Sequence, residues 1–402
     1  MKNIKYLLII ITTVILSWAM PYSYHLIYDV APSNVFTYYS SVDHAFCKIN
    51  FDEKEERLIR MNVNTKKEYT QMEFDSILPL FFCRQLLADG RMPETIDGYA
   101  ITPDVINEKT FNYNYSPKDK NRPHIPLYTL FESISGRVRL EMPGDMFRIT
   151  DKIEFLRPSS KDVDRTKSDK FQKALEAKGF CFPATQLAGN PNPRKPYEEG
   201  YLILDQQNQL FHLKMVNGKP FVKQITIPDG LSPQFIETQE PADRSFYAFV
   251  FGSDGEVFTL TTDNYSFQRL PIPPFDLETN QLSIMANPLY WNVSVISRKG
   301  RENWAISTQD YSIVDKYIEK SAPNKAHFTQ YVFPFSVDFT SPYSSFIRPV
   351  IYFGSYWVAL GNIALALLML FIFRGRKKEN VLWTLLTGIY GFIATLLFNR
   401  VD

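Results

Sequence analysis

Histidines and cysteines are the residues of this chain whose side chains could carry chemistry. The five histidines lie singly, and no two have the spacing of a metal-binding helix or ribbon. Cys47, Cys83 and Cys181 are too few for a disulfide scaffold and too far apart for a zinc site, which leaves one disulfide or three buried thiols open. The sequence has no phosphate-binding glycine loop, nucleophile elbow or zincin motif. We therefore predict no catalytic residue, no metal site and no cofactor.

The charge balance narrows the classes of partner. The chain has 44 basic and 43 acidic residues, a formal net charge of +1, so no global field would attract nucleic acid or an anionic substrate. Aromatic residues make up 15% of its 402 residues, and there are 26 prolines but only 17 glycines. This composition is typical of short strands joined by rigid turns. It predicts a folded, β-rich middle region and no nucleic-acid partner.

Residues 1–28 form a candidate membrane anchor. Lys2 and Lys5 precede an apolar run from Tyr6 to Met20. This run of about 15 residues is short for a membrane span, which takes about 20, but the tyrosines that follow resemble an interfacial belt. We predict an uncleaved signal anchor, and the small residues around Ser17-Trp18-Ala19 keep cleavage open as the alternative. Either form would send the next residues across the membrane.

Two further apolar segments lie near the other end of the chain. Residues 350–373 and 381–398 contain no ionisable side chain and are predicted as transmembrane helices. The connection between them, residues 374–380, begins with a dense basic turn. Basic residues stay on the cytoplasmic side, so this turn and the N-terminus are predicted to face inwards. Residues 31–349 and the last residues, 399–402, are then predicted to lie outside.

Small and polar residues in these two segments are candidates for helix packing. The seven predicted packing residues are Ser355, Ala359, Asn362, Thr384, Gly388, Gly391 and Thr395. The last four recur at helical spacing on one face, and such a face lets another helix approach closely. Asn362 lies on a different face from the two residues before it and would be costly in lipid unless bonded to a neighbour. We expect the two helices to pack on each other, and the alternative is that they pack on a partner's membrane domain. The absence of charged side chains in both helices argues against an ion path through this chain alone.

Residues 31–349 are predicted to form one extracytoplasmic β-rich domain. A strand–turn–strand pattern in residues 201–225 returns in residues 246–270, about 47 residues later, and again near Trp304. This period is typical of propeller blades, and about 300 residues would hold six or seven of them. A pair of β-sandwiches is the alternative fold. Two helices are expected, at residues 74–88 and 160–178, and the Pro- and Tyr-rich residues 112–126 are expected to be a surface linker or a recognition loop.

Residues 74–93, with the sequence FDSILPLFFCRQLLADGRMP, carry a resemblance to a known family. Together with the N-terminal anchor and the terminal helix pair, this stretch resembles uncharacterised membrane proteins of Gram-negative anaerobes, over nearly the whole chain. Members of that family tend to be encoded beside ABC-type transporter components. The resemblance therefore implies an accessory role at the inner membrane, and it implies no activity and no functional residues.

Three functional hypotheses follow. The first is a non-enzymatic binding or scaffold module, anchored in the bacterial inner membrane with its large domain in the periplasm, whose C-terminal helices contact lipid and a transporter permease. The second is an extracytoplasmic enzyme whose polar residues converge from distant blades in the propeller channel; a cluster of acids or histidines there would favour it. The third is a membrane sensor, which the short cytoplasmic segments disfavour.

Overall fold

The chain folds as two units. The structure, a computed structural model, describes residues 2–28, 35–52, 56–158, 162–320, 329–372 and 378–398. Residues 34–320 form one unit, the β-rich unit, and residues 1–33 together with 321–402 form the other, the helical unit. Residues 329–349, which the sequence had placed in the β-rich domain, thus belong to the same unit as the two ends of the chain.

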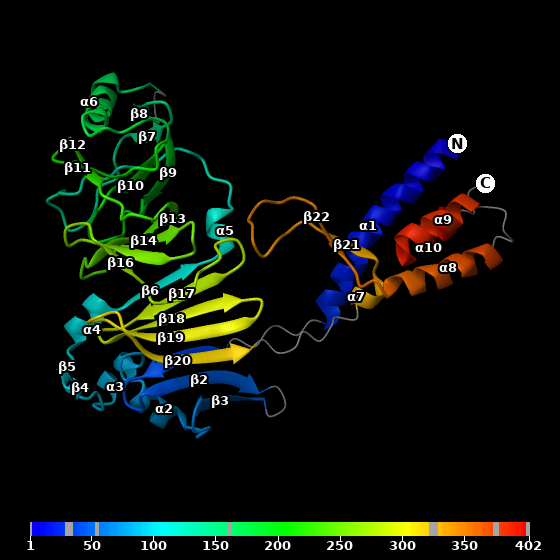
Figure 1. Ribbon diagram of the computed structural model, residues 1–402, viewed down its shortest axis with the longest axis horizontal. Coiled ribbons are helices and arrows are strands. Elements are labelled where there is room, and N and C mark those ends of the chain that lie inside the picture. The colour runs from blue at the N-terminus through cyan, green and yellow to red at the C-terminus, as the bar shows by residue number, and fades with distance from the viewer. Residues whose placement is uncertain are drawn as a thin grey trace. The chain divides into compact units, whose positions relative to one another are not determined.

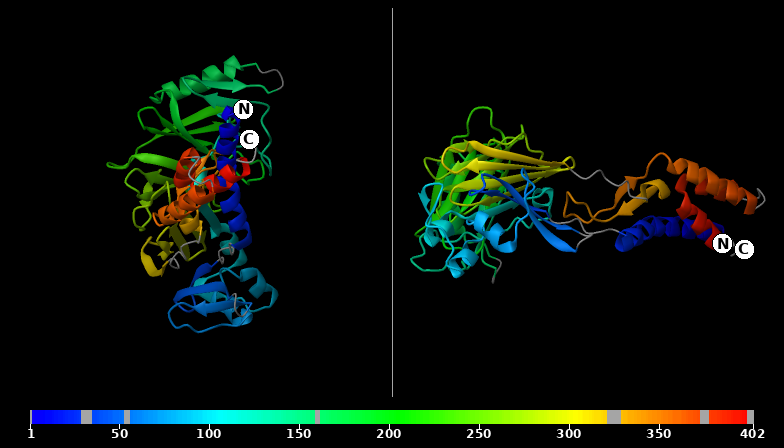
Figure 2. Two further views of the ribbon diagram at one scale, coloured as in Figure 1. Left: turned by 90° about the vertical axis from the view of Figure 1, so that its right-hand side faces the viewer. Right: turned by 90° about the horizontal axis from the view of Figure 1, so that it is seen from below.

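The helical unit combines helices from both ends of the sequence with one β-hairpin. Its elements are α1 (Lys2–Tyr28), α7 (Thr329–Val332), β21 (Phe335–Asp338), β22 (Val350–Phe353), α8 (Val358–Ile372), α9 (Lys378–Thr387) and α10 (Ile389–Phe398). Helices α9 and α10 lie between α1 and α8 (Figure 2, right). Strands β21 and β22 pair in antiparallel register, with Phe335 opposite Phe353.

Among the described residues of this unit, one helix is long and apolar enough to cross a membrane. It is α1, over the 25 residues Ile4–Tyr28, whereas the apolar helices α8 and α10 have 15 and 10 residues. At a rise of about 1.5 Å per residue, these two would extend about 22 and 15 Å, against a hydrocarbon core about 30 Å thick. The two predicted C-terminal spans are therefore not confirmed.

The C-terminal segments depart from the prediction for two local reasons. Val350–Phe353 is a strand, so α8 begins only at Val358. Gly388 has a φ of +59°, which ends α9, and the chain then folds back. A Cβ atom on Gly391 would lie 3.1 Å from the carbonyl oxygen of Trp383, although residues eight apart in a straight helix are separated by about 12 Å. Helices α9 and α10 therefore form a helical hairpin (Figure 1). Most of the predicted basic turn, residues 374–377, and the terminal residues 399–402 lie outside the described residues.

Four antiparallel sheets make up most of the β-rich unit. Sheet I contains β1 (Phe36–Ser40), β2 (Ala45–Asp52) and β3 (Arg57–Asn62). Sheet II contains β6 (Phe111–Tyr115), β17 (Gln281–Ala286), β18 (Tyr290–Ser297), β19 (Gly300–Ser307) and β20 (Ile313–Lys320). Sheet III contains β13 (Pro233–Thr238), β14 (Phe246–Gly252), β15 (Val257–Thr261) and β16 (Phe267–Arg269). Sheet IV contains β9 (Ala184–Gly189), β10 (Tyr201–Asp205), β11 (Leu210–Val216) and β12 (Lys219–Ile225).

Short helices and hairpins fill the connections between the sheets. The hairpins are β4 (Thr95–Ile96) with β5 (Tyr99–Ala100), and β7 (Met146–Ile149) with β8 (Ile153–Leu156). The helices are α2 (Gln71–Ile77), α3 (Cys83–Ala88), α4 (Pro103–Lys109), α5 (Pro117–Lys120) and α6 (Arg165–Glu176). The expected helix at residues 160–178 is confirmed as α6, whereas the one at 74–88 is interrupted around Pro79 and becomes α2 and α3.

The mainly β class is confirmed, and three of the sheets have the strand order of propeller blades. Consecutive strands β9–β12, β13–β16 and β17–β20 each form an antiparallel meander, the connectivity of a propeller blade. The repeated patterns at residues 201–225 and 246–270 are β10–β12 and β14–β16. Sheets I to IV follow one another in a row (Figure 1). Within the described ranges they form no closed ring, and the three meanders and the three-stranded sheet fall short of six or seven blades.

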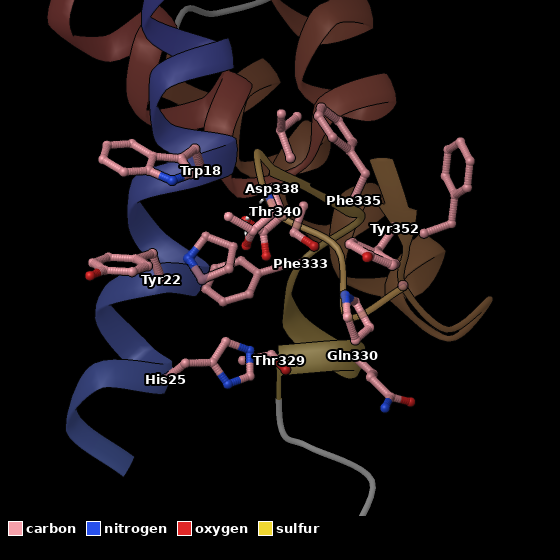
Figure 3. A pocket seen from close by; sticks show the side chains of 16 residues that line it. Trp18, Tyr22, His25, Thr329, Gln330, Phe333, Phe335, Asp338, Thr340 and Tyr352 are labelled. Carbon is pink, nitrogen blue, oxygen red and sulfur yellow. Dashed lines mark hydrogen bonds between the residues drawn. The ribbon is translucent and has the colours of Figure 1, made fainter. Parts of the chain in front are cut away.

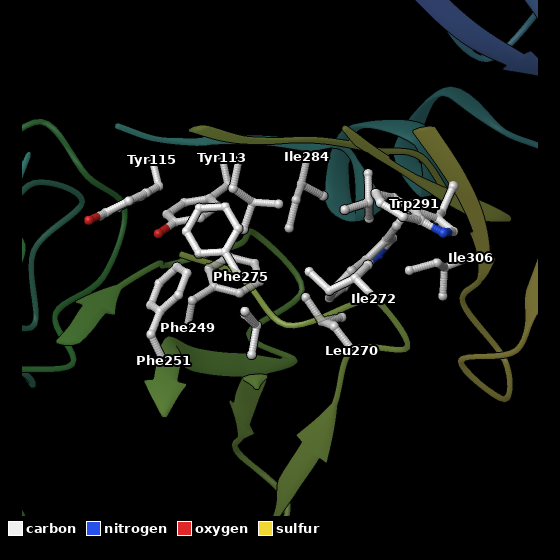
Figure 4. Close-up of a cluster of buried hydrophobic side chains, with 14 of the residues drawn as sticks. Tyr113, Tyr115, Phe249, Phe251, Leu270, Ile272, Phe275, Ile284, Trp291 and Ile306 are labelled. Carbon is white, nitrogen blue, oxygen red and sulfur yellow. The ribbon is translucent and has the colours of Figure 1, made fainter. Parts of the chain in front are cut away.

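The largest hydrophobic core joins sheets II and III (Figure 4). Strand β6 pairs with β17 at the edge of sheet II, and its residue Tyr113 stacks on Phe249 of β14 with ring centroids 4.1 Å apart. Trp304 is among the largest fully buried side chains. Burial of such side chains stabilises by about 2–3 kcal/mol each, which fixes these two sheets to one another.

Candidate functional site

A cavity of about 440 Å³ lies within the helical unit (Figure 3). Its volume falls in the range of about 300–1,000 Å³ that is usual for small-molecule pockets. The aromatic side chains that line it are Trp18, Tyr22, Phe333, Phe335, Tyr352 and Phe353. The polar ones are His25, Thr329, Gln330, Ser336, Asp338 and Thr340. Aromatic and polar side chains therefore line the cavity in equal number.

Helical spacing and strand pairing bring these residues together. Trp18, Tyr22 and His25 are four and three residues apart, so they share one face of α1 (Figure 3). Trp18 stacks on Tyr22, with ring centroids 5.6 Å apart. The opposite wall comes from α7 and the β21–β22 hairpin, which is closed by a hydrogen bond from the Gly354 N–H to the Pro334 carbonyl oxygen at 3.0 Å.

Asp338 supplies the negative charge of the cavity. The backbone N–H groups of Phe339 and Thr340 donate to its Oδ1 atom, at 2.7 and 3.2 Å. In the described part of the chain no residue bonds its second carboxylate oxygen. Among the described residues that line the cavity there is no lysine or arginine. The local charge is therefore suited to a cationic group and not to an anion.

A second polar cluster is buried in the β-rich unit, between sheets III and IV. Lys195 Nζ lies 2.7 Å from Glu240 Oε1 and 3.1 Å from Glu198 Oε2, and all three side chains are at most 5% exposed. Asn190 Nδ2 donates to the second oxygen of Glu240 at 2.8 Å, and the Glu199 N–H donates to the first at 3.1 Å. Glu240 follows β13, whereas the other residues precede β10, so the network ties the two sheets together.

His212 lies beside this network and is held neutral. Burial is the main cause that lowers its pKa to about 3, and the charge of Lys214 adds to the effect. Its Nε2 atom contacts the Glu199 carbonyl oxygen, which can only accept, so Nε2 carries the proton. Nδ1 then accepts from the Tyr265 hydroxyl at 2.9 Å.

This cluster of acids and a histidine has no room for a substrate. The cavity beside His212 and Glu240 measures about 10 Å³, which is about the space of one water molecule. Lys195, Glu240 and His212 also have protein partners on their polar atoms. The arrangement is that of an internal ion network, and it gives no support to an enzyme site in a propeller channel.

The network predicts a pH dependence of stability. One lysine faces two carboxylates, and burial raises the pKa of Glu198 from 4.5 to about 7 even though Lys195 lowers it. The folded state therefore holds a proton that the unfolded state has lost, and the stabilisation present below pH 4.5 is lost as the pH rises through 7. We expect the free energy of unfolding to fall by up to about 3 kcal/mol over this range. The variant Glu198→Gln should remove this dependence. Urea unfolding of both proteins at pH 5.5 and 8 measures the free energy of unfolding. An equal change in this free energy between the two pH values in both proteins would contradict the prediction.

The predicted packing residues divide between buried and exposed positions. Thr384 and Thr395 are fully buried, and Asn362 is 8% exposed on the buried face of α8. Gly388 and Gly391 lie at the turn of the α9–α10 hairpin, where added Cβ atoms would clash with neighbours. Ser355 precedes α8, and Ala359 is exposed.

Helix α1 contributes a packing face that the sequence did not reveal. Its buried positions are Ile9, Thr13, Ser17 and Pro21, one helical turn apart. Trp383 Nε1 of α9 donates to Thr13 Oγ1 at 3.1 Å, and Tyr6 donates its hydroxyl to Glu379 Oε2 at 2.7 Å. Helix α1 and the C-terminal helices thus form one bundle. The spacing of small and polar residues at 13 and 17 was the available signal.

Asn362 completes the hairpin turn. Its Nδ2 donates to the Leu385 carbonyl oxygen at 3.2 Å, three residues before Gly388, whose positive φ marks the end of α9. We expect Asn362→Ala to destabilise the helical unit by about 1 kcal/mol, the usual net contribution of a hydrogen bond to stability. Thermal melting of the full chain in detergent measures the loss. Asn362→Asp, which cannot donate, should do at least as much damage; an unchanged melting temperature for both would contradict the role.

The three cysteines, Cys47, Cys83 and Cys181, have free thiols. Burial raises the pKa of the Cys47 thiol to about 12, with a smaller contribution from Asp43, so this thiol is unreactive at neutral pH.

Comparisons with known proteins bear on the β-rich unit. A family model described as Domain of unknown function (DUF4857) matches residues 36–306, which is consistent with the resemblance to an uncharacterised family. No curated protein matches the chain significantly.

Similar solved structures include propellers at low identity. PorZ, a bacterial surface component of the type-IX secretion system of Porphyromonas gingivalis, is 10% identical with a TM-score of 0.23; the match covers 73% of this chain and only 28% of PorZ. The β-propeller domain of Cps50 (Swd1) from Myceliophteria thermophila is 7% identical, with a TM-score of 0.24 and coverage of 72% and 91%. The WD40 domain of SCAP from fission yeast is 8% identical, with a TM-score of 0.23 and coverage of 82% and 77%. Similarity at this level carries no information on function.

Proposed function

The chain belongs to the DUF4857 family, whose domain has no known function, and from that premise we propose that it is a non-enzymatic, membrane-anchored binding or scaffold module of the bacterial inner membrane. The proposal extends to an accessory role in an ABC-type transport system, with the β-rich unit in the periplasm. The observation that carries it is the assembly of α1, α8, α9 and α10 into one unit, distinct from the β-rich unit.

The outer surface of the helical unit supports membrane anchoring. Many apolar side chains on α1 and α8 remain 45% exposed or more, among them Leu7, Ile11, Val14, Ile15, Leu360, Ile363, Leu367 and Phe371. An apolar surface of this kind is a mark of contact with lipid or with another protein. The packing of α1 against α9 and α10 further supports an anchor that is retained, because cleavage near Ala19 would remove the buried positions Ile9, Thr13 and Ser17 from the bundle.

The proposed topology places both basic segments, the N-terminus and the turn that begins residues 374–380, in the cytoplasm. The contact between Tyr6 and Glu379 supports it, because it places the beginning of α1 beside the beginning of α9. Since α10 folds back along α9, we place the C-terminus in the cytoplasm too, opposite to the expectation for a single span over 381–398. The α9–α10 hairpin would then enter the membrane without crossing it.

A cysteine-accessibility experiment tests this topology. The three native cysteines are replaced by alanine, and Asn217→Cys, Arg376→Cys or a cysteine after Asp402 is introduced. In intact spheroplasts, a membrane-impermeant thiol reagent should label only the cysteine at 217. Labelling after Asp402 would restore the single-span topology, and labelling at 376 would overturn the proposed orientation.

Affinity purification of the tagged full chain in mild detergent tests the accessory role. Recovery of an ATPase and a permease supports it, and their repeated absence rejects it. Ala359 offers a sharper comparison, since it is exposed on α8 where a partner helix could approach. We expect Ala359→Leu to reduce permease recovery, whereas Ala364→Leu, at an exposed position on a different face, should not.

A further inference from the structure

The cavity of the helical unit lies near the end of the anchor helix, and this position restricts its ligand. Over Ile4–Tyr28, α1 extends about 37 Å, longer than the hydrocarbon core of about 30 Å. With the lysines at its start in the cytoplasmic interface, Tyr22 and His25 reach the opposite headgroup region, where tyrosine and tryptophan are enriched. This step rests on the membrane anchoring proposed above.

The chemistry of the lining restricts the ligand further. Trp18 and Tyr22 of α1, Phe333 and three rings of the β21–β22 hairpin line the cavity, and the carboxylate of Asp338 lines it as well (Figure 3). Aromatic faces next to a carboxylate bind ammonium groups, through cation–π and ionic attraction together. A phosphate group would find no lysine or arginine among the described lining residues. His25, Gln330 and Thr329 line the lower part of the cavity in Figure 3 and offer hydrogen-bonding groups for the rest of a polar headgroup.

We propose that this cavity binds the ammonium headgroup of a zwitterionic phospholipid from the outer leaflet of the inner membrane. Trp18 and Tyr22 supply the aromatic faces, and Asp338 supplies the counter-charge. Asp338 is held for this role because the Phe339 and Thr340 N–H groups fix one of its oxygens. The lipid's acyl chains would remain along the exposed apolar surface of α1.

The experiment uses the full chain in nanodiscs of phosphatidylglycerol, alone or mixed with an equal part of phosphatidylethanolamine. The protein is then released in mild detergent, and the lipid it retains is measured by native mass spectrometry. We expect retention of phosphatidylethanolamine over phosphatidylglycerol. Asp338→Asn and Tyr22→Leu should each reduce that preference about fivefold or more. Asp338→Asn keeps an acceptor for the two N–H groups, so it tests the charge without removing the turn.

Two matched variants control for general damage. Tyr356→Leu removes an exposed tyrosine of the same unit that does not line the cavity, and Asp229→Asn removes an exposed carboxylate of the β-rich unit. Both should keep the wild-type lipid preference. Equal loss in the control variants would overturn the assignment of the site.

The outcomes separate this inference from the proposed function. Equal retention of both lipids by a protein that resists alkaline carbonate extraction overturns the headgroup site and leaves the anchor intact. A protein that carbonate extracts from the membrane overturns both. In a further arm, free ethanolamine is added to phosphatidylglycerol nanodiscs. If the protein retains free ethanolamine in preference to phosphatidylethanolamine, the cavity binds a soluble amine and the lipid source is overturned.

Discussion

Replacing Glu240 by alanine is expected to destabilise the β-rich unit by about 3–5 kcal/mol, the usual cost of leaving a buried ion without its partner. Glu240 accepts from Lys195, from the Asn190 side chain and from the Glu199 backbone, and all of these are lost together. Glu198 offsets part of the loss, because it remains 3.1 Å from Lys195 and would ionise more readily. Hydrogen exchange of the full chain, followed by mass spectrometry, should show faster exchange in peptides from β9 to β14.

The matched control is an exposed ion pair in the same unit. Glu302 and Lys316 lie 3.1 Å apart, but both side chains are 40% exposed. Water screens such a pair, so Glu302→Ala should cost less than about 1 kcal/mol. If the two variants accelerated exchange equally, the buried network would not be what joins sheets III and IV.

Strands flanked by local turn signals could be predicted from sequence. Asn217 and Gly218 both have positive φ values, 51° and 69°, as a two-residue hairpin turn requires, and this pair marks the β11–β12 hairpin. The information lies within a few residues of the turn. For the same reason the meanders β10–β12 and β14–β16 were placed correctly, whereas the number of sheets and the open row were not, because these depend on contacts between distant segments.

Strand β6 shows where local reasoning failed. Residues 112–126 were expected to be a surface linker or recognition loop because of their prolines and tyrosines, but β6 pairs with β17 and buries Tyr113 and Tyr115. The alternation of Phe111, Tyr113 and Tyr115 was a signal of a strand with one buried face. Its partner lies about 170 residues further along, and nothing local identifies it.

The candidate sites were hidden for a similar reason. The cavity combines α1 with residues 329–354, and the ends of the chain give no sequence indication that they meet. Trp18 and Tyr22 were visible only as part of an interfacial belt or a cleavage site. Lys195 and Glu198 precede a buried strand and resemble an ordinary charged turn, because their burial depends on Glu240 of another sheet.

Replacing Gly388 by alanine is the substitution expected to affect the helical unit most. A Cβ atom there would lie 2.3 Å from Asn362 Oδ1, and the φ of +59° costs an L-residue about 1–2 kcal/mol before any clash. We expect a loss of about 3 kcal/mol or more in the stability of the unit, because Asn362 would also be displaced from the Leu385 carbonyl oxygen. Thermal melting of the full chain in detergent, followed by the circular dichroism of its helices, measures this loss.

Gly361→Ala is the matched control, since Gly361 lies in α8 with open space around it. In the interior of a helix, alanine is more favourable than glycine by about 1 kcal/mol, so this variant should melt at the same temperature as the wild type or higher. The comparison also decides between the two forms of the C-terminal segment. In a straight helix over 381–398, Gly388→Ala would stabilise just as Gly361→Ala does, whereas in the helical hairpin the two substitutions have opposite signs. A stabilising effect of Gly388→Ala would therefore contradict the helical hairpin, and with it the proposed cytoplasmic position of the C-terminus.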